Sequence, residues 1–226
     1  MDEKFEIKKE DYFKENGGIV IANPNAPTGV AASVSMIEEI IKANQDVVVI
    51  VDEAYVDFGG ESCVPLVEKY DNLLVVQTFS KSRSMAGMRI GFAIGSKKLI
   101  GFLNDAKFSF NSYTMNATSI IAGVASVEDE AYFQKITGKV IATREWTKKE
   151  LTRLGFTFTD SKTNFIFATH KSIPAQEIFD VLRENQIFVR HWNKERIGNH
   201  LRISIGTDEE MKQVIDFLEK YINERK

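Results

Sequence analysis

The sequence has little of several things that define other protein classes. It contains one cysteine, Cys63, so no disulfide can form within the chain and a four-cysteine zinc site is excluded. It has only four prolines and no low-complexity tract, and its hydrophobic content of 43% excludes a disordered or collagen-like chain. No apolar run reaches the ~18 residues of a membrane-spanning helix. The net charge of −3 provides no basic field for nucleic acid. We therefore predict a globular protein with no membrane or nucleic-acid partner, in which any bound anion is held by local positive groups.

Two further features bear on location and metal content. The N-terminal residues Met1–Lys4 are charged and no apolar stretch follows them, which argues against a signal peptide. An unpaired cysteine is typical of the reducing cytoplasm, so we predict a cytoplasmic protein. The three histidines lack metal-ligand spacing, and we predict no metal site.

The first half of the chain alternates short apolar runs with a helical pattern. A structured turn, Asn-Pro-Asn-Ala-Pro-Thr-Gly, follows the first run at residues 23–29. Ser35 and Glu38 form a capping box that predicts a helix after this turn. Continuous β-branched runs are typical of strands buried on both faces, as in parallel sheets. The predicted strands comprise residues 19–22, 47–51, 73–76 and 89–94.

The second half has a different pattern, with longer helices and scattered strands. The predicted helices comprise residues 117–127, residues 129–154 ended by Gly155, one from Pro174, and a last one capped by Thr207 and Glu210. The predicted strands comprise residues 156–158, 164–168, 187–190 and 201–205. We predict an α/β domain over residues 1–128, with a mainly parallel sheet flanked by helices, and a smaller α+β domain over residues 129–226.

Four aromatic residues lie close together in the sequence between these halves: Phe102, Phe108, Phe110 and Tyr113. Aromatic side chains supply much of the buried area of protein cores. We expect this cluster to pack in the core, with a place in a pocket wall as the alternative.

The segment Val51-Asp52-Glu53-Ala54-Tyr55 places a carboxylate at the end of a predicted buried strand. In open α/β sheets, ligands bind at the carboxyl ends of the strands. Asp52 and Tyr55 are therefore candidate site residues. The alternative is that the acidic residue caps a helix or lies in a solvated turn.

A second polar segment, residues 77–92, follows the next buried strand. Ser80, Lys81 and Arg89 supply a hydroxyl and two cations, which can cradle an anion such as phosphate. Lys81 can alternatively act as a nucleophilic amine. The competing interpretation is a solvated basic turn.

Two arginines mark the strands near the C-terminus. Arg202 begins an apolar strand, where a charge is costly unless it is paired, and Arg190 ends the preceding predicted strand. We expect Arg190 to lie beside Arg202, which can bridge to a structural carboxylate.

Four segments taken together resemble the motifs of the fold type I, pyridoxal-phosphate-dependent aminotransferases of classes I and II. These segments are the turn at residues 23–29, Asp-Glu-Ala-Tyr, Ser-Lys-Ser with Ala-Gly-Met-Arg-Ile-Gly, and Leu-Arg-Ile-Ser-Ile-Gly. Within this family, the likeness is greatest to the histidinol-phosphate aminotransferases. The resemblance implies pyridoxal 5′-phosphate as cofactor, an amino donor such as histidinol phosphate, 2-oxoglutarate as the 2-oxo acid, and a homodimer. The alternatives on the same scaffold are an aromatic or other amino-acid aminotransferase and a threonine-phosphate decarboxylase.

The resemblance also implies roles for the candidate residues. Lys81 is implied to form the Schiff base and to carry the proton in the 1,3-transfer, while Asp52 pairs with the pyridine nitrogen. Tyr55 is implied to donate to the phenolic oxygen. The remaining assignments are Ser80 and Arg89 to the cofactor phosphate, and Arg202 with Arg190 to the carboxylate or phosphate of the substrate.

Two departures from the family pattern are visible. The asparagine usually found directly before Pro-Thr-Gly is replaced by Ala26, so Asn25 is assigned to the cofactor in its place. The chain also begins beyond the family's first strands and glycine-rich phosphate turn. We therefore expect an N-terminally truncated domain, with four neighbouring strands that have lost partners on both sides. A catalytically silent fragment is the non-enzymatic alternative.

Overall fold

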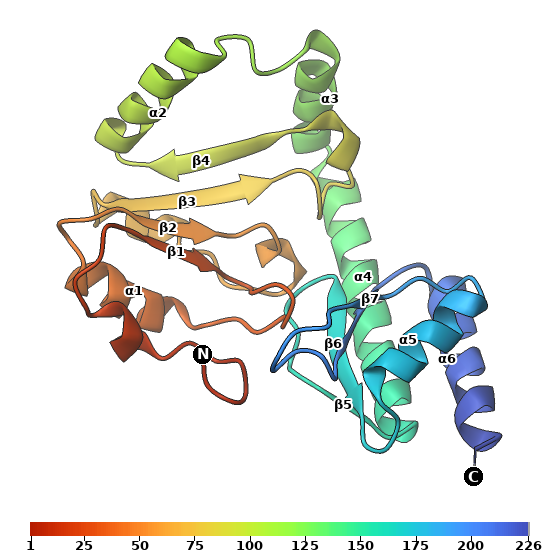
Figure 1. Cartoon of the computed structure of the whole chain (residues 1–226). Coiled ribbons are helices and arrows are strands. Elements are labelled where there is room, and N and C mark those ends of the chain that lie inside the picture. The colour runs from red at the N-terminus through yellow and green to blue at the C-terminus, as the bar shows by residue number, and fades with distance from the viewer. Residues whose placement is uncertain (226) are drawn as a thin grey trace.

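Two four-stranded sheets organise the chain in the computed structural model, which describes residues 1–225 (Figure 1). The first sheet has the order β1-β2-β3-β4. Its strands are β1 (Ile19–Ala22), β2 (Val49–Asp52), β3 (Leu73–Thr78) and β4 (Gly91–Gly95). The first three strands are parallel and β4 is antiparallel to β3. The expected run of four neighbouring strands, with β1 and β4 at the edges, is confirmed.

The register of the parallel strands sets where their ends lie. Asp52, the last residue of β2, pairs with Ala22 on β1 and Val76 on β3. The carboxyl ends of all three strands therefore meet at one edge of the sheet. The loops that leave this edge carry Asn25, Tyr55 and Lys81.

Helix α1 (Val34–Ala43) covers one face of this sheet and buries Ile37, Ile40 and Ile41 against it. The predicted Ser35 cap is wrong, because the helix begins two residues earlier. Ser33 has an extended backbone, and its side chain accepts from the Met36 N–H at 3.2 Å.

The other face of the first sheet is more open than the sequence predicted. Val20 on β1 is 69% exposed, so this strand is covered on one face only. Short 3-10 helices complete the region: η1 (Lys9–Tyr12), η2 (Val56–Phe58), η3 (Val64–Glu68) and η4 (Ala86–Met88).

Helices α2 (Lys97–Phe110) and α3 (Ala117–Glu128) lie beyond β4, at the end of the molecule away from the second sheet (Figure 1). The sequence did not predict α2. Its aromatic cluster is not in the core, because the four side chains are between 58% and 94% exposed. The reason is positional: α2 follows an edge strand, and no described element packs over its outer side.

The second sheet is antiparallel and has the order β5-β6-β8-β7. Its strands are β5 (Phe156–Phe158), β6 (Phe165–His170), β7 (Arg190–His191) and β8 (Leu201–Ser204). The predicted strand over residues 187–190 is reduced to the two residues of β7. Ile187 and Val189 pack against the core instead.

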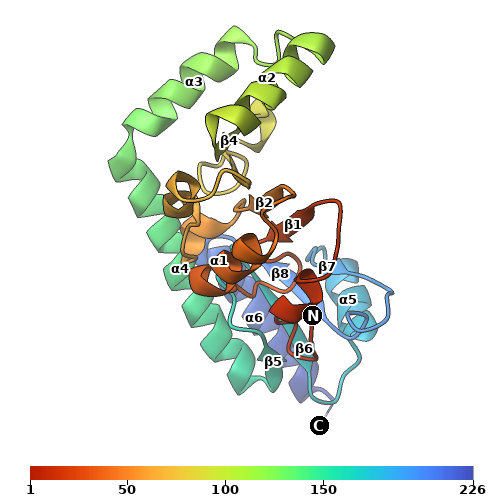
Figure 2. The same ribbon diagram turned by 90° about the vertical axis from the view of Figure 1, so that its left-hand side faces the viewer.

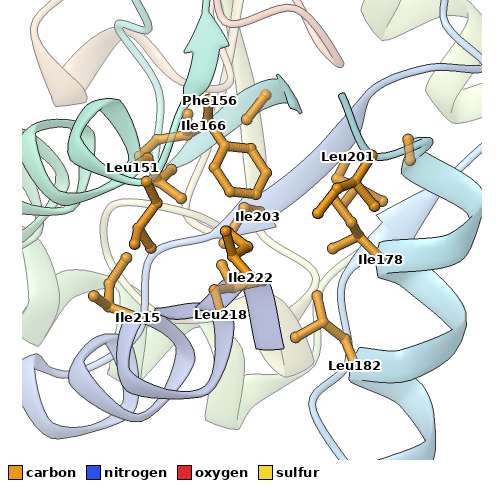
Figure 3. Packing of buried hydrophobic residues seen from close by; sticks show 14 of the residues in the cluster. Leu151, Phe156, Ile166, Ile178, Leu182, Leu201, Ile203, Ile215, Leu218 and Ile222 are labelled. Atoms are coloured by element: carbon orange, nitrogen blue, oxygen red, sulfur yellow. The ribbon is translucent and has the colours of Figure 1, made fainter. Parts of the chain in front are cut away.

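Three helices complete this second unit: α4 (Glu130–Arg153), α5 (Ala175–Glu184) and α6 (Asp208–Asn223). Gly155 has φ +90°, as expected for a helix stop, and Thr207 with Glu210 forms the predicted capping box. Pro174 is the N-cap of α5, one position before the place predicted. Leu151, Phe156, Ile178 and their neighbours fill the core between helices and sheet (Figure 3).

Helix α4 joins the two halves of the molecule. It follows α3 after Asp129 and runs down beside the second sheet (Figure 2). The break between α3 and α4 coincides with the expected domain boundary near residue 128, which stays a prediction. Within residues 1–225, no helix combines the length and hydropathy needed to cross a membrane.

Candidate functional site

The loops after β2 and β3 meet at the carboxyl edge of the first sheet. Asp52 ends β2, and its Oδ1 accepts a hydrogen bond from the Ala54 N–H at 3.0 Å. Tyr55 follows in the same loop. Lys81, in the loop after β3, places its Nζ 5.4 Å from the centroid of the Tyr55 ring. The parallel pairing of adjacent strands thus brings a carboxylate, a phenol and an amine to the same edge of the sheet.

The Lys81 amine is held by the face of an aromatic ring. Within residues 1–225, its Nζ makes no hydrogen bond or ion pair. A cation over a tyrosine face is attracted by the ring quadrupole but remains able to react. The amine is therefore positioned by Tyr55 without being neutralised by a carboxylate.

A line of ring contacts leads from Tyr55 to the second sheet. The Tyr55 and Phe165 rings meet edge to face at 5.2 Å between centroids. The Arg202 guanidinium lies 4.9 Å from the Phe165 centroid and 5.7 Å from that of Trp192. Phe165 thereby connects the amine site of the first sheet to the arginines of the second.

The two predicted arginines are neighbours. Arg190 and Arg202 face each other across the β7–β8 pair, and the Arg190 guanidinium lies 5.5 Å from the Trp192 centroid. The Arg202 Nε is buried and has no hydrogen-bond partner among the described residues. Because buried donors in native proteins nearly always find an acceptor, this nitrogen points to a ligand acceptor.

The assigned phosphate residues share a loop but do not touch each other through hydrogen bonds. The Ser80 N–H donates to Thr78 Oγ1 at 3.0 Å, and Thr78 Oγ1 donates to the Ile90 carbonyl at 3.2 Å. Arg89 is exposed, has φ +55°, and donates to the Ala86 carbonyl at 2.9 Å. The assignment of Ser80 and Arg89 to a phosphate stays a prediction.

Asn25 is engaged within its own turn. Its Oδ1 accepts from Thr28 Oγ1 at 2.8 Å, and its N–H donates to the Val30 carbonyl at 2.8 Å. No hydrogen bond among the described residues joins it to Tyr55. Its assignment to the cofactor likewise stays a prediction.

The sequence reasoning missed Glu53, a buried carboxylate beside Asp52. Glu53 is 2% exposed and accepts from Ser62 Oγ at 2.7 Å, the Cys63 N–H at 2.5 Å and Gln77 Nε2 at 2.8 Å. Burial, followed by the Glu53 charge, raises the pKa of the Cys63 thiol to about 12. The only signal in the sequence was a second carboxylate at the strand end, since its partners lie in other segments. Phe165 and Trp192 were missed for the same reason.

The sequence matches a known family over most of its length. A family model described as aminotransferase class I and II matches residues 3–218. The histidinol-phosphate aminotransferase of Lactococcus lactis subsp. cremoris (strain SK11) is 58% identical over 225 residues, which is 100% of this chain and 63% of that protein. The histidinol-phosphate aminotransferase of Clostridium botulinum (strain Langeland) is 54% identical over 99% of this chain and 63% of its own length. The chain thus spans 63% of the length of these relatives.

Solved structures share the fold. The histidinol-phosphate aminotransferase from Clostridium acetobutylicum superimposes with a TM-score of 0.90 at 22% identity, covering 99% of this chain and 70% of that one. The histidinol-phosphate aminotransferase from Sinorhizobium meliloti, solved in complex with pyridoxal-5′-phosphate, gives a TM-score of 0.83 at 23% identity over 93% of this chain and 58% of that one. At these identities the likeness concerns the fold alone.

Proposed function

This chain belongs to the class I and II aminotransferases, and from that membership we propose that it carries the amine site of a pyridoxal-phosphate-dependent transaminase. The proposed amino donor is histidinol phosphate and the proposed acceptor is 2-oxoglutarate. The observation that carries the proposal is the Lys81 Nζ, 5.4 Å from the Tyr55 ring centroid, in the loop beside Asp52. Curated relatives at 52–58% identity that bear the histidinol-phosphate aminotransferase name support the donor.

The residues present fit this cofactor. Within residues 1–225, Asp52 uses only Oδ1 in a hydrogen bond, so Oδ2 is available to a protonated ring nitrogen. The Lys81 amine has no competing carboxylate, and the Tyr55 hydroxyl has no hydrogen-bond partner in the same range. Carboxylate, amine and phenol are the donor set that a pyridine aldehyde requires.

Each residue then has a defined task in the proposed reaction. When bound, pyridoxal phosphate supplies an aldehyde for amine capture and a ring that accepts electrons. Asp52 would keep the ring nitrogen protonated, and the Tyr55 hydroxyl would donate a hydrogen bond to the ring oxygen. Lys81 Nζ would take the proton from the substrate α-carbon as general base and, as general acid, deliver the same proton to the carbon that was the aldehyde carbon of the cofactor. Arg202 and Arg190 bind the anionic end of the substrate, where the unpartnered Nε supplies a donor.

The proposal is tested by replacing the amine. We expect the chain to become yellow with pyridoxal phosphate, and Lys81→Ala to remain colourless while Lys149→Ala, at an exposed position on α4, behaves as the parent chain. Colour that survives in Lys81→Ala contradicts the assignment. A colourless parent chain favours the non-catalytic interpretation.

The donor is tested separately. Histidinol phosphate, an aromatic amino acid and threonine phosphate are each added with 2-oxoglutarate, and glutamate and carbon dioxide are measured. The proposal is supported if histidinol phosphate is the single donor of the three that yields glutamate. Glutamate from the aromatic amino acid, or carbon dioxide from threonine phosphate, supports the corresponding alternative.

We propose further that two copies of the chain associate through the outer side of α2 and α3. This surface carries exposed apolar side chains, Phe108, Phe110, Tyr113 and Ile121 among them. Large exposed apolar side chains on neighbouring elements are typical of interaction surfaces. Sedimentation velocity should give a dimer for the parent chain and a monomer for a Phe110→Lys/Ile121→Lys variant. A monomeric parent chain contradicts the proposal.

A working location in the cytoplasm is also proposed. The thiol of Cys63 is buried and has no partner cysteine in the sequence. A protein of this kind suits a reducing compartment. Fractionation of cells that express the chain, followed by detection with an antibody, tests the location.

A further inference from the structure

A hydrogen bond links the loop of the amine to the loop of the phenol. Ser82, the residue directly after Lys81, is 3% exposed, and its Oγ donates to Asp57 Oδ2. Asp57 lies in η2, two residues after Tyr55. Among the described residues, this is the single side-chain hydrogen bond that joins residues 54–59 to residues 79–85.

The next residue anchors the loop in another direction. Arg83 Nη1 donates to the Ser126 carbonyl at 2.5 Å, and its guanidinium lies 4.2 Å from the Phe133 centroid and 5.3 Å from that of Phe79. Arg83 thus fixes the loop to α3 and α4. It does not fix the distance between the loop and Tyr55, which leaves that task to the Ser82–Asp57 bond.

We propose that Ser82 and Asp57 are positioning residues that set the Lys81 amine over the Tyr55 ring. The inference rests on the proposed function, because it assigns the placement of the same amine. The physical reason is proximity: Lys81 is covalently next to Ser82, and Tyr55 is two residues from Asp57, so a bond between the second pair limits the separation of the first. A bond from a buried hydroxyl to a carboxylate is charge-assisted and stronger than a neutral one.

This role differs measurably from simple stabilisation. Loss of a positioning pair lowers the rate constant for covalent capture of pyridoxal phosphate by Lys81 and leaves the half-saturating cofactor concentration unchanged. A pair that only stabilises the fold affects both quantities together with the melting temperature. The adduct is trapped by borohydride reduction and located at Lys81 by mass spectrometry.

The experiment compares Ser82→Ala, Asp57→Ala and the double variant at several cofactor concentrations. We expect each single variant and the double variant to lose the same factor, about tenfold in rate constant, because either change removes the whole bond. Ser82→Thr keeps a hydroxyl and should recover most of the rate. Ser126→Ala is the matched control, since only the backbone carbonyl of that residue takes part in the loop contacts.

Several results would overturn the inference. The pairing is contradicted if the rate constant of the double variant falls by the product of the two single factors. It is also contradicted if the rate constant of either single variant falls by less than about twofold, or if that of Ser126→Ala falls equally. If Ser82→Thr does not recover the rate constant, the role of the Ser82 hydroxyl in positioning Lys81 is contradicted.

A second readout keeps the inference separable from the proposed function. Acetylation of Lys81 by acetic anhydride needs no cofactor and is measured by mass spectrometry against exposed Lys149. We expect Ser82→Ala and Asp57→Ala to raise Lys81 labelling by the same several-fold factor, because the half-buried amine is released from the ring. If the parent chain captures no cofactor, the proposed function fails while this labelling test still decides the inference: unchanged labelling in both variants overturns it.

Discussion

Replacing Arg144 should weaken the connection between the two sheets. This residue of α4 is 3% exposed and donates from Nη1 to the Phe58 carbonyl at 2.8 Å and to the Thr163 carbonyl at 2.8 Å. Its Nε pairs with Glu145 at 2.9 Å. Phe58 ends η2 in the first unit, and Thr163 precedes β6 in the second. One guanidinium therefore satisfies a carbonyl from each half of the molecule.

The size of the effect follows from these contacts. Arg144→Met keeps most of the side-chain volume but leaves two buried carbonyls without a donor, at roughly 1–3 kcal/mol each. Removing a buried cation returns part of that cost, because its desolvation is relieved. We expect a net loss of about 3 kcal/mol in the free energy of unfolding, which corresponds to a fall of about 6–12 °C in melting temperature for a chain of this size.

Urea unfolding followed by circular dichroism measures the loss, and calorimetry measures the melting temperature. Arg153→Met on the same helix is the control, because Arg153 is exposed and its ion pairs with Glu150 and Glu219 lie at the surface. A loss below about 1 kcal/mol in Arg144→Met, or an equal loss in Arg153→Met, would refute the assignment of Arg144 as the buried link.

Three other predictions concern turns, the thiol and pH. Gly29 has φ +76°, and an added Cβ would lie 2.6 Å from a serine oxygen. Gly29→Ala should therefore lower the free energy of unfolding, measured in urea, by about 2–3 kcal/mol. Gly138 lies in a helix with open space around it, so the control Gly138→Ala should raise the same quantity by about 0.5–1 kcal/mol. Cys63, with a pKa of about 12, should react with a thiol reagent at pH 7 only after urea unfolds the chain, and fast labelling of the native chain would contradict its burial. Burial lowers the pKa values of His170 and His200 below 6.5, so the unfolded chain binds more protons and stability should fall as the pH drops from about 7 to 5. The urea midpoints of a His170→Gln/His200→Gln variant should lose most of that dependence, and an unchanged slope would contradict it.

Elements with a local cause could be predicted from the sequence. The β-branched and apolar runs became β1, β2 and β3, since a buried strand needs such side chains wherever it lies. The Thr207–Glu210 capping box and the Gly155 stop were also predictable, because each satisfies backbone groups within a few residues.

Elements decided by distant partners could not be predicted. Helix α2 has a mixed pattern, and the exposure of Phe110 depends on which elements lie beside it. The choice of Ser33 over Ser35 as the N-cap depended on where the chain leaves the preceding turn. The three donors of Glu53 come from segments up to 24 residues away, and no spacing rule connects them.

The candidate site shows the same division within a single set of residues. Asp52, Tyr55 and Lys81 could be located from the sequence because parallel strands carry their carboxyl ends to one edge, so residue type and strand position suffice. Asn25 and Arg89 match by position as well, yet their side chains are engaged by Thr28 and by the Ala86 carbonyl in their own turns. Each keeps unused donors within residues 1–225, the Asn25 Nδ2 and the Arg89 Nε and Nη2, so the bonds in their turns leave both side chains able to meet a ligand. Burial separates the two arginines: the Arg202 Nε is buried without a partner among the described residues, whereas Arg89 is exposed to solvent, so Arg202 gives the stronger reason to expect a bound anion.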